Sequence, residues 1–229
     1  MKIVIIGGNP GGMSAAARLV RKGKDAKVIV FEKTNEVSYG ACGLPYYISG
    51  ENEDIDKMRI RKAPEFIESG VDLRLFHEVL SIDTDAKSVT VKNLKTGETF
   101  TEGYDKLIIA TGAASVRPPL PGADKAYVLK TLEDGERIKE AAKGAKRAVI
   151  IGGGYIGLEL AEALRRLEIE LTVIEAQDRV LSVFDPEFSQ IAMDALLRGG
   201  VDVRCGERVQ ENGDDYVATD KSRYPSDLT

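Results

Sequence analysis

Two stretches of the chain repeat one order of features: a short apolar strand, a glycine-rich turn, a helix, and a second apolar strand that ends in glutamate. They cover residues 2–33 and 146–177. Glycines in such a turn let a pyrophosphate approach the amino end of the helix, where free N–H groups and the helix dipole favour anions. The two stretches therefore predict an α/β fold with two Rossmann-like dinucleotide-binding units in series, each a parallel sheet with helices and an antiparallel β-meander.

The first unit departs from the usual glycine pattern. Its predicted strands are residues 3–6 and 27–31, and its predicted helix is residues 13–22. The turn reads GGNPGG, so that Asn9 stands where the G-x-G-x-x-G pattern has its middle glycine. Glu32 follows the second strand, where an acid accepts hydrogen bonds from a ribose diol. Taken alone, this unit leaves an alternative open, because glycine-rich turns also occur in α/β proteins that bind nothing.

The second unit has the unbroken pattern. Gly152, Gly154 and Gly157 follow a predicted strand at residues 148–151, and a strand predicted at 170–174 ends at Glu175. A carboxylate at this position hydrogen-bonds a ribose 2′-hydroxyl and repels a 2′-phosphate, which favours NADH over NADPH. Arg179 lies close enough in sequence to keep NADPH as an alternative. Two nucleotide sites in one chain indicate that one nucleotide passes electrons to the other.

The segment between the two units predicts an antiparallel β-meander. Short strands are expected at residues 71–75, 79–82, 88–92 and 98–101, with turns at 83–87 and 95–97. The apolar run 107–110 is expected to rejoin the first sheet. Prolines at positions 118, 119 and 121 mark a connection, because a residue without an N–H group fits a strand poorly. We place the domain boundary there, with a first domain at residues 1–115 and a second at 116–229.

Composition narrows the partners that this chain is expected to have. The 229 residues carry a net charge of -5 and no apolar run near the roughly 20 residues of a membrane helix, so neither nucleic acid nor a membrane is expected. Two distant cysteines and a single histidine argue against a disulfide framework and against a metal site. The first residues lead straight into a strand without an export signal, which predicts a cytoplasmic protein.

Cys42 is the candidate reactive group. It precedes a Gly/Pro turn and a predicted helical turn in the stretch SYGACGLPYYISG, where backbone N–H groups and a helix end favour a thiolate. The alternative is a small buried apolar residue, the common fate of a lone cysteine. Because the sequence has no second cysteine nearby, Cys42 would act alone or with a substrate thiol. His77 lies among predicted strand residues and is expected to be structural, and the same role is expected of Cys205.

Ser14, Arg18 and Arg21 share one face of the first predicted helix, because they are spaced by four and three residues. The apolar residues between them can pack inward. A solvated helical face is one interpretation of these polar residues. The other is a binding surface for a thiol ligand that carries phosphate groups, since the same helix begins at the first nucleotide turn.

The order of these features resembles the FAD-dependent pyridine nucleotide-disulfide oxidoreductases, and within them the single-cysteine branch of coenzyme A-disulfide reductases and NADH oxidases. The resemblance covers nearly the whole chain. It rests on the segments IIGGNPGGMSAAARL, FEK, SYGACGLPYYISG, LIIATGA, VIIGGGYIGLELAEAL and TVIEA. It implies FAD at the first unit, NADH or alternatively NADPH at the second, and Cys42 as the catalytic, redox-active residue.

The resemblance also assigns residues to each site. For FAD it implies Gly7, Gly8, Gly11, Gly12, Glu32, Lys33, Val79, Ala110, Thr111 and Gly112. For the nicotinamide nucleotide it implies Gly152, Gly153, Gly154, Tyr155, Ile156, Gly157 and Glu175. For a small thiol or disulfide substrate it implies Ser14, Arg18, Arg21 and Ser38. No metal is expected.

Two positions help to choose within this branch. Pro10 stands where NADH oxidases and peroxidases generally carry a histidine, and the segment CGLPYY is more similar to the coenzyme A-disulfide reductases. Ala41 departs from the asparagine that many of those reductases carry before the cysteine. The resemblance therefore implies a flavoprotein that passes electrons from NADH through FAD to a disulfide, with coenzyme A disulfide favoured. NADH oxidase and NADH-dependent polysulfide reductase are the alternatives.

Members of this family continue past the second nucleotide unit into a further FAD-binding segment and a dimerisation domain. From the resemblance we expect that this C-terminal part of the family fold is absent from the chain, and that the full-length protein is a homodimer. A further alternative is a catalytically silent nucleotide-binding fragment.

Overall fold

The computed structural model describes residues 1–23 and 25–229 and divides them into two compact units. The first unit consists of Met1–Gly40 and Asp56–Ala113, and the second of Ala41–Ile55 and Ala114–Thr229. Each unit contains a parallel sheet and an antiparallel sheet of its own, which confirms the predicted α/β class with two Rossmann-like units. The domain boundary predicted between residues 115 and 116 stays a prediction.

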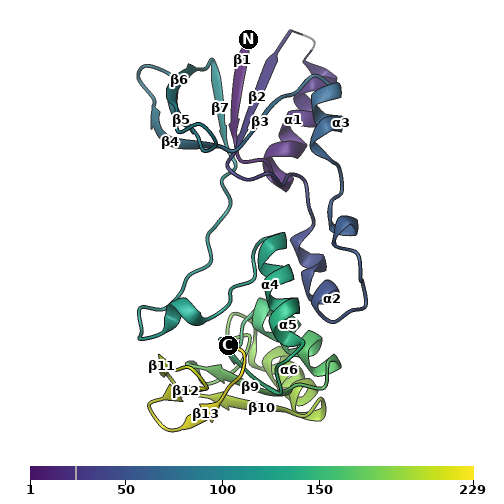
Figure 1. Cartoon of the computed structure of the whole chain (residues 1–229), viewed down its shortest axis with the longest axis vertical. Coiled ribbons are helices and arrows are strands. Elements are labelled where there is room, and N and C mark those ends of the chain that lie inside the picture. The colour runs from purple at the N-terminus through teal and green to yellow at the C-terminus, as the bar shows by residue number, and fades with distance from the viewer. Residues whose placement is uncertain (24) are drawn as a thin grey trace. The chain divides into compact units, whose positions relative to one another are not determined.

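The first unit is built on a parallel sheet with the strand order β3-β2-β1-β7. Its two central strands are apolar at residues 3–6 and 28–31 because both faces of the sheet are covered there. One face packs on helices α1 and α3, and the other packs on the meander, as Figure 1 shows. The elements of this layer are β1 (Lys2–Ile6), α1 (Pro10–Lys22), β2 (Lys27–Glu32), α3 (Ala63–Glu68), β3 (Asp72–Leu75) and β7 (Lys106–Ile109).

Alternate residues of β1 divide the core of the first unit. Ile3 and Ile5 pack with Met13 of α1, whereas Val4 and Ile6 pack with Val89 of the meander. Helix α1 begins at Pro10, three residues before the predicted start at position 13. Proline suits the first helical position, because its fixed φ is already helical and the N–H that it lacks would have no partner there.

The meander of the first unit contains three of the four strands predicted in this segment, whereas the strand predicted at 71–75 is β3 of the parallel sheet. The meander consists of β4 (His77–Asp83), β5 (Ser88–Asn93) and β6 (Thr99–Gly103), paired antiparallel in that order. Side chains close both turns: Asp83 accepts hydrogen bonds from two backbone N–H groups at 2.8 and 3.0 Å, and Asn93 accepts two at 2.9 and 3.2 Å. Such bonds are the reason that these residue types favour turns.

The second unit repeats the arrangement with a smaller parallel sheet, β10-β9-β8, and a meander, β11-β12-β13. A core of Val149, Ile174, Val217 and Tyr224 joins the two sheets. The predicted fold class included this second meander, although no bounds were predicted for the elements after residue 177. The elements are α4 (Leu132–Ala142), β8 (Arg147–Ile151), α5 (Tyr155–Arg166), β9 (Glu170–Glu175), α6 (Pro186–Arg198), β10 (Val201–Cys205), β11 (Val209–Asn212), β12 (Tyr216–Thr219) and β13 (Arg223–Pro225).

The segment around Cys42 belongs to the second unit. It forms a 3₁₀ turn, η1 (Ala41–Gly43), and a short helix, α2 (Leu44–Ile48), which packs on α4 and α5. Leu44 is fully buried against Gly135 of α4, where a Cβ atom would lie 2.7 Å from the leucine Cδ2. The Lys139 ammonium lies 3.9 Å from the centre of the Tyr47 ring. These contacts attach the thiol-bearing segment to the helices beside the second nucleotide turn.

Two further 3₁₀ turns, η2 (Ile55–Met58) and η3 (Ala123–Lys125), complete the element order. No helix in the described part of the chain is both long enough and apolar enough to cross a membrane.

Candidate functional site

The first glycine turn is closed by contacts that exclude a side chain. Gly7 has φ +106°, in the region that favours glycine, and a Cβ atom on Gly12 would lie 1.9 Å from the Gly7 carbonyl oxygen. A Cβ atom on Gly7 would itself lie 2.3 Å from the carbonyl oxygen of Ala110, the residue that follows β7. The turn and the end of β7 therefore approach backbone to backbone, at two of the positions assigned to FAD.

The Glu32 carboxylate is held in place at the same turn. One oxygen accepts the Gly8 N–H at 2.7 Å, and the other accepts the backbone N–H and the hydroxyl of Thr34, both at 2.8 Å. A carboxylate has about four lone-pair positions, so these bonds fix its orientation and leave acceptor capacity for a ribose.

A cavity of about 170 Å³ in the first unit brings five of the predicted FAD residues together. They are Gly7, Glu32, Lys33, Val79 and Thr111. Of the other predicted FAD residues, Gly8 is buried within the turn, and Gly11 and Gly112 are exposed. His77 lines this cavity as well, although the sequence predicted only a structural role for it.

The second glycine turn has the same construction. Gly152 has φ +108°, and a Cβ atom on Gly157 would lie 2.2 Å from the Gly152 carbonyl oxygen. The Glu175 carboxylate accepts the N–H groups of Gly153 and Gln177, both at 2.7 Å. The structure thus places the glutamate of each unit against the second glycine of its own turn.

The middle position of each turn explains why Asn9 is tolerated. Asn9 and Gly154 have φ values of −103° and −85°, which any residue adopts, and a Cβ atom on Gly154 would meet nothing within 4 Å. The Asn9 side chain turns away from the helix end and accepts the Tyr39 N–H at 3.1 Å. No side chain of the described residues caps the amino end of α1 or α5, so neither helix has a capping side chain as acceptor for its first N–H groups.

The repeat extends into the loops after the glutamates, which sequence reasoning missed. Ser38 and Leu181 both have left-handed φ values, 50° and 49°. Their N–H groups donate to the carbonyl oxygens of Gly8 and Gly153, at 3.0 and 2.8 Å. The residues before them, Val37 and Val180, are buried against the same two glycines. The sequence signal for this repeated loop is a valine five positions after each glutamate.

Cys42 is exposed, so the alternative of a buried apolar cysteine is wrong. It lies two residues before α2 and lines a cavity of about 230 Å³ in the second unit. One wall of this cavity comes from α5 and includes Glu159, Glu162 and Arg166. The Arg166 guanidinium forms ion pairs with Glu51 and Glu162. These α5 residues were not predicted, because nothing local in the sequence links them to the cysteine.

The predicted substrate residues lie on the first unit. Ser14, Arg18 and Arg21 are exposed on α1, and no hydrogen bond or ion pair joins the two arginines to another described residue. Ala16, on the opposite face, is fully buried, as expected. Ser38 is half-buried at the first glycine turn.

The second cysteine and the histidine both occupy strands, β10 and β4. Cys205 pairs with Glu175 across β10 and β9, and burial raises the pKa of its thiol, with the Glu175 charge as a smaller cause. His77 Nδ1 lies 2.7 Å from the Leu75 carbonyl oxygen. Among the residues that the structure describes, no group of three or more histidine, cysteine or acidic side chains could hold a metal ion.

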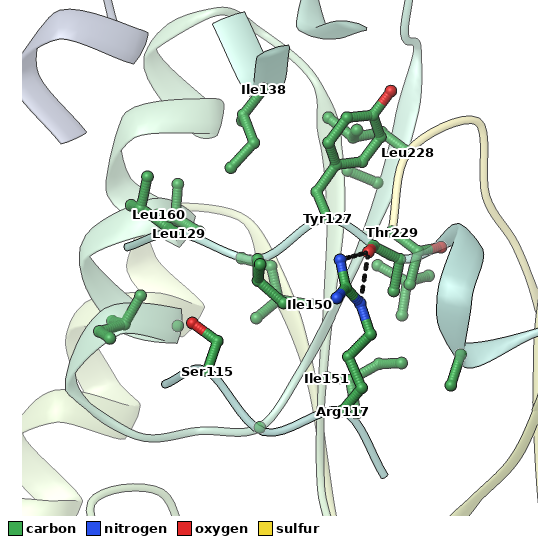
Figure 2. Close-up of a pocket in the computed structure, with 18 of the residues that line it drawn as sticks. Ser115, Arg117, Tyr127, Leu129, Ile138, Ile150, Ile151, Leu160, Leu228 and Thr229 are labelled. Carbon is green, nitrogen blue, oxygen red and sulfur yellow. Dashed lines mark hydrogen bonds between the residues drawn. The ribbon is translucent and has the colours of Figure 1, made fainter. Parts of the chain in front are cut away.

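A larger cavity, of about 320 Å³, lies beside β8 in the second unit (Figure 2). Its walls are mostly apolar and include Ile150 and Ile151 of β8 and Leu160 of α5. The Arg117 guanidinium at its edge donates to the Ala126 carbonyl oxygen at 3.2 and 3.3 Å. Three predicted nucleotide residues, Gly152, Ile156 and Gly157, line it too. Tyr155 is exposed, and its ring meets that of Phe184 edge to face.

Comparisons with known proteins agree with this geometry. The chain is 34% identical over 232 residues to an NADH oxidase of Enterococcus faecalis, covering 100% of the chain and 51% of that protein. It is 32% identical over 222 residues to a coenzyme A disulfide reductase of Staphylococcus epidermidis, covering 95% and 50%. The solved structure of a NAD-dependent persulfide reductase from A. fulgidus matches with a TM-score of 0.94 and 35% identity, covering 100% of the chain and 45% of that structure.

The chain spans about half the length of the curated relatives that it matches. The family model described as pyridine nucleotide-disulphide oxidoreductase matches residues 1–229, from one end of the chain to the other. On this match, and on the two glycine turns that carry it, the chain belongs to the pyridine nucleotide-disulphide oxidoreductase family.

Proposed function

We propose that this chain carries the nucleotide-binding and thiol-bearing part of an FAD-dependent NAD(P)H oxidoreductase that reduces a small disulfide. The observation that carries the proposal is the repeated turn, in which a closed glycine backbone and a fixed glutamate face an uncapped helix end in both units. Two such sites suit two dinucleotides, and Cys42 provides an exposed sulfur. The whole protein is proposed to act as a homodimer.

The first turn is proposed to hold the adenosine half of FAD. Its backbone fits this group, because the crowding at Gly7 and Gly12 leaves no side chain between the turn and an approaching pyrophosphate. Glu32 would accept hydrogen bonds from the ribose, and Lys33 is exposed beside it. When bound, FAD would carry the two electrons of NADH to a sulfur atom. Gly8, Gly11, Val79, Ala110, Thr111 and Gly112 complete the proposed site.

The second turn is proposed to bind NADH in preference to NADPH. Hydrogen bonds from Gly153 and Gln177 hold the Glu175 carboxylate at the end of β9. A 2′-phosphate brought to this carboxylate would meet a like charge, whereas a 2′-hydroxyl can donate to it. Arg179 is half-buried four residues after this glutamate, and its positive charge would favour some binding of NADPH. Gly152, Gly154, Tyr155, Ile156 and Gly157 form the rest of the proposed site.

Cys42 is proposed to be the catalytic nucleophile. Its thiolate attacks one sulfur of a substrate disulfide, a bond forms between the two sulfurs, and the other half of the substrate leaves as a thiolate that takes up a proton. Cleaving the resulting mixed disulfide back to the Cys42 thiolate and a second thiol consumes two electrons, which NADH supplies. One NADH is therefore oxidised for each disulfide reduced to two thiols.

Coenzyme A disulfide is the proposed substrate. Its phosphate groups would need cationic partners, and Arg18 and Arg21 offer two exposed guanidinium groups on one face of α1. Ser14 and Ser38 would add hydroxyl donors. A relative of this chain is named for the same reaction.

The experiment compares Cys42→Ser with Cys205→Ser in NADH oxidation driven by coenzyme A disulfide. We expect the first substitution to abolish turnover and the second, which removes a strand cysteine, to leave it within about twofold. Turnover that persists in Cys42→Ser would refute the role of the thiol.

Two other functions have specific support, because relatives are named NADH oxidase and persulfide reductase. Offering oxygen, polysulfide and coenzyme A disulfide separately ranks these acceptors by the rate of NADH consumption. A catalytically silent fragment would give colourless protein that gains no flavin spectrum with added FAD.

A further inference from the structure

The segment that bears Cys42 is part of the second unit, whereas the residues before and after it are part of the first. The two passages of the chain that connect it to the first unit pair with each other, in an antiparallel bridge between Tyr39 and Arg59. This paired base, residues 38–40 and 58–60, is the neck of the segment. Whatever closes the neck determines where the chain departs toward the thiol.

Backbone hydrogen bonds close the neck and attach it to the first glycine turn. The Gly40 N–H donates to the Met58 carbonyl oxygen at 2.9 Å. The Ile60 N–H donates to the Ser38 carbonyl oxygen, also at 2.9 Å. The Ser38 N–H in turn donates to the Gly8 carbonyl oxygen at 3.0 Å. Both passages of the chain are thus fastened to each other and to the turn.

The second unit shows that a glycine turn of this kind does not need a neck. Leu181 donates to its turn as Ser38 does, but the chain then continues within the unit to α6 at Pro186. In the first unit the Tyr39 N–H also donates to the Asn9 side chain, at 3.1 Å. The neck is therefore an addition to the first turn, and what it carries is the segment with the thiol.

The Arg59 guanidinium ties the neck to the loop that precedes it. Nε and one terminal nitrogen donate to the two carboxylate oxygens of Glu36, at 2.8 and 2.6 Å, and the other terminal nitrogen forms an ion pair with Asp56. Only 23% of the Arg59 side chain and 21% of the Glu36 side chain are exposed. A bidentate pair fixes orientation as well as distance, and lysine cannot reproduce its geometry.

We infer that Arg59 is a positioning residue for the Cys42 thiol, because its ion pair with Glu36 closes the neck from which the thiol-bearing segment extends. This inference rests on the proposed role of Cys42. Since Cys42 follows the neck residue Gly40 by two positions, an opened neck lets its sulfur move. Reaction with a bound substrate is sensitive to such movement, because a misplacement of about 1 Å can reduce a rate about 100-fold.

The test uses the full chain without FAD or NADH. It measures the rates at which Cys42 forms a mixed disulfide with coenzyme A disulfide and with hydroxyethyl disulfide, each reaction releasing one thiol. Hydroxyethyl disulfide is small and uncharged and needs no positioned site, so the ratio of the two rates reports positioning, whereas the intrinsic reactivity of the thiol affects both rates alike. In the wild type we expect coenzyme A disulfide to react at least about tenfold faster.

Two variants remove the ion pair from its two sides. We expect Arg59→Gln to lower the ratio about tenfold and to leave the rate with hydroxyethyl disulfide within about twofold of the wild type. Glu36→Gln should lower the ratio in the same way, which keeps the test valid if one variant fails to fold. Arg59→Lys retains the charge without the bidentate geometry and should give an intermediate ratio.

Arg74→Gln is the matched control. It removes another bidentate and partly buried ion pair of the first unit, the pair with Asp72, which lies outside the neck. We expect it to leave the ratio unchanged. Cys205 serves as an internal control, because mass spectrometry of the peptides separates its reaction from that of Cys42, and its rate should be the same in every variant.

Hydrogen exchange measures the opening of the neck directly. The Gly40 and Ile60 N–H groups donate across the neck, and in Arg59→Gln they should exchange with solvent about tenfold faster than in the wild type. An unchanged exchange rate, or a wild-type ratio retained in both Arg59→Gln and Glu36→Gln, would overturn the inference alone. A wild type without preference for coenzyme A disulfide would overturn it together with the proposed substrate.

Discussion

The glycine turns of the two units share a backbone and differ in what surrounds it. In both, the last glycine of the turn closes on the first, and the glutamate accepts the N–H of the second. A left-handed residue donates to the carbonyl oxygen of that second glycine. In the first unit the Ala110 carbonyl lies against Gly7, whereas Gly152 has open space at the corresponding place. The difference teaches that backbone closure is common to the two turns, whereas close contact with the end of a neighbouring strand belongs to the first turn.

The largest expected effect distinguishes backbone strain from steric crowding at the first glycine of each turn. Gly7→Ala and Gly152→Ala both place a side chain at φ above +100°, which costs about 1–2 kcal/mol, but only Gly7 also meets a carbonyl oxygen at 2.3 Å. That overlap adds about 1–3 kcal/mol. We expect Gly7→Ala to lower the free energy of unfolding by clearly more than Gly152→Ala in urea denaturation. Equal losses would show that the Ala110 contact does not distinguish the units.

The second largest expected effect comes from removing the negative charge of the glutamate at one of the two turns. Glu175→Gln keeps an oxygen for the Gly153 N–H and removes the negative charge that repels a 2′-phosphate. We expect the ratio of NADPH to NADH dissociation constants to fall about tenfold, equivalent to about 1.4 kcal/mol. The matched variant Glu32→Gln should weaken FAD binding and leave that ratio as it was. A ratio unchanged in Glu175→Gln would contradict the assignment of NADH preference to this carboxylate.

Restoring the glycine pattern of the first turn should have a smaller effect. Asn9→Gly removes the bond to the Tyr39 N–H, worth about 0.5–1.5 kcal/mol, and keeps a backbone that any residue adopts. We expect a small loss of thermal stability with FAD affinity within about twofold of the wild type. A large loss of FAD affinity, measured by fluorescence titration, would mean that the asparagine contacts the cofactor.

The smallest expected effect concerns stability at acid pH, to which one ion-paired carboxylate in each unit contributes. Arg74 holds the pKa of the Asp72 carboxyl below its usual value through hydrogen bonds of 2.9 and 3.1 Å, and Arg147 does the same for Asp227 in the second unit. A carboxyl group whose pKa is lower in the folded than in the unfolded chain stabilises the fold above about pH 4. This contribution is lost as the pH falls further. Since the Asp72–Arg74 ion pair is partly exposed, we expect it to contribute about 0.5 kcal/mol to the free energy of unfolding.

The check is the pH dependence of urea unfolding. Asp72→Asn should flatten the curve below about pH 4, and Asp227→Asn, whose partner is more exposed, should flatten it less. The reverse order would show that exposure does not set the size of the effect.

The sequence predicted the parts of this fold that local patterns determine. Apolar strands, glycine turns and the turn residues Asp83 and Asn93 each form through their own neighbours, so β1, β2, β8, β9 and the first meander were found. Helix α1 was started too late because Pro10 was read as part of the turn. The bond from Tyr39 to Asn9 and the α5 wall beside Cys42 join distant segments, and no periodicity reports such contacts.

The residues of both glycine turns could also be predicted from local patterns, whereas their ligands stay predictions. Glycines and glutamates carry their position in a motif, so the residues around both turns could be named in advance. His77 was treated as structural because a histidine within a strand gives no local sign of the cavity that it borders. Its neighbours there come from β2, from the segment after it and from the end of β7, which only the folded sheet brings together.

The matching left-handed residues, Ser38 and Leu181, bear on ancestry. Neither serine nor leucine favours that conformation, yet the same backbone bond holds both. An uncommon conformation at the same place in both loops indicates common descent. The two halves of this chain therefore retain the imprint of a single ancestral nucleotide-binding segment that was duplicated.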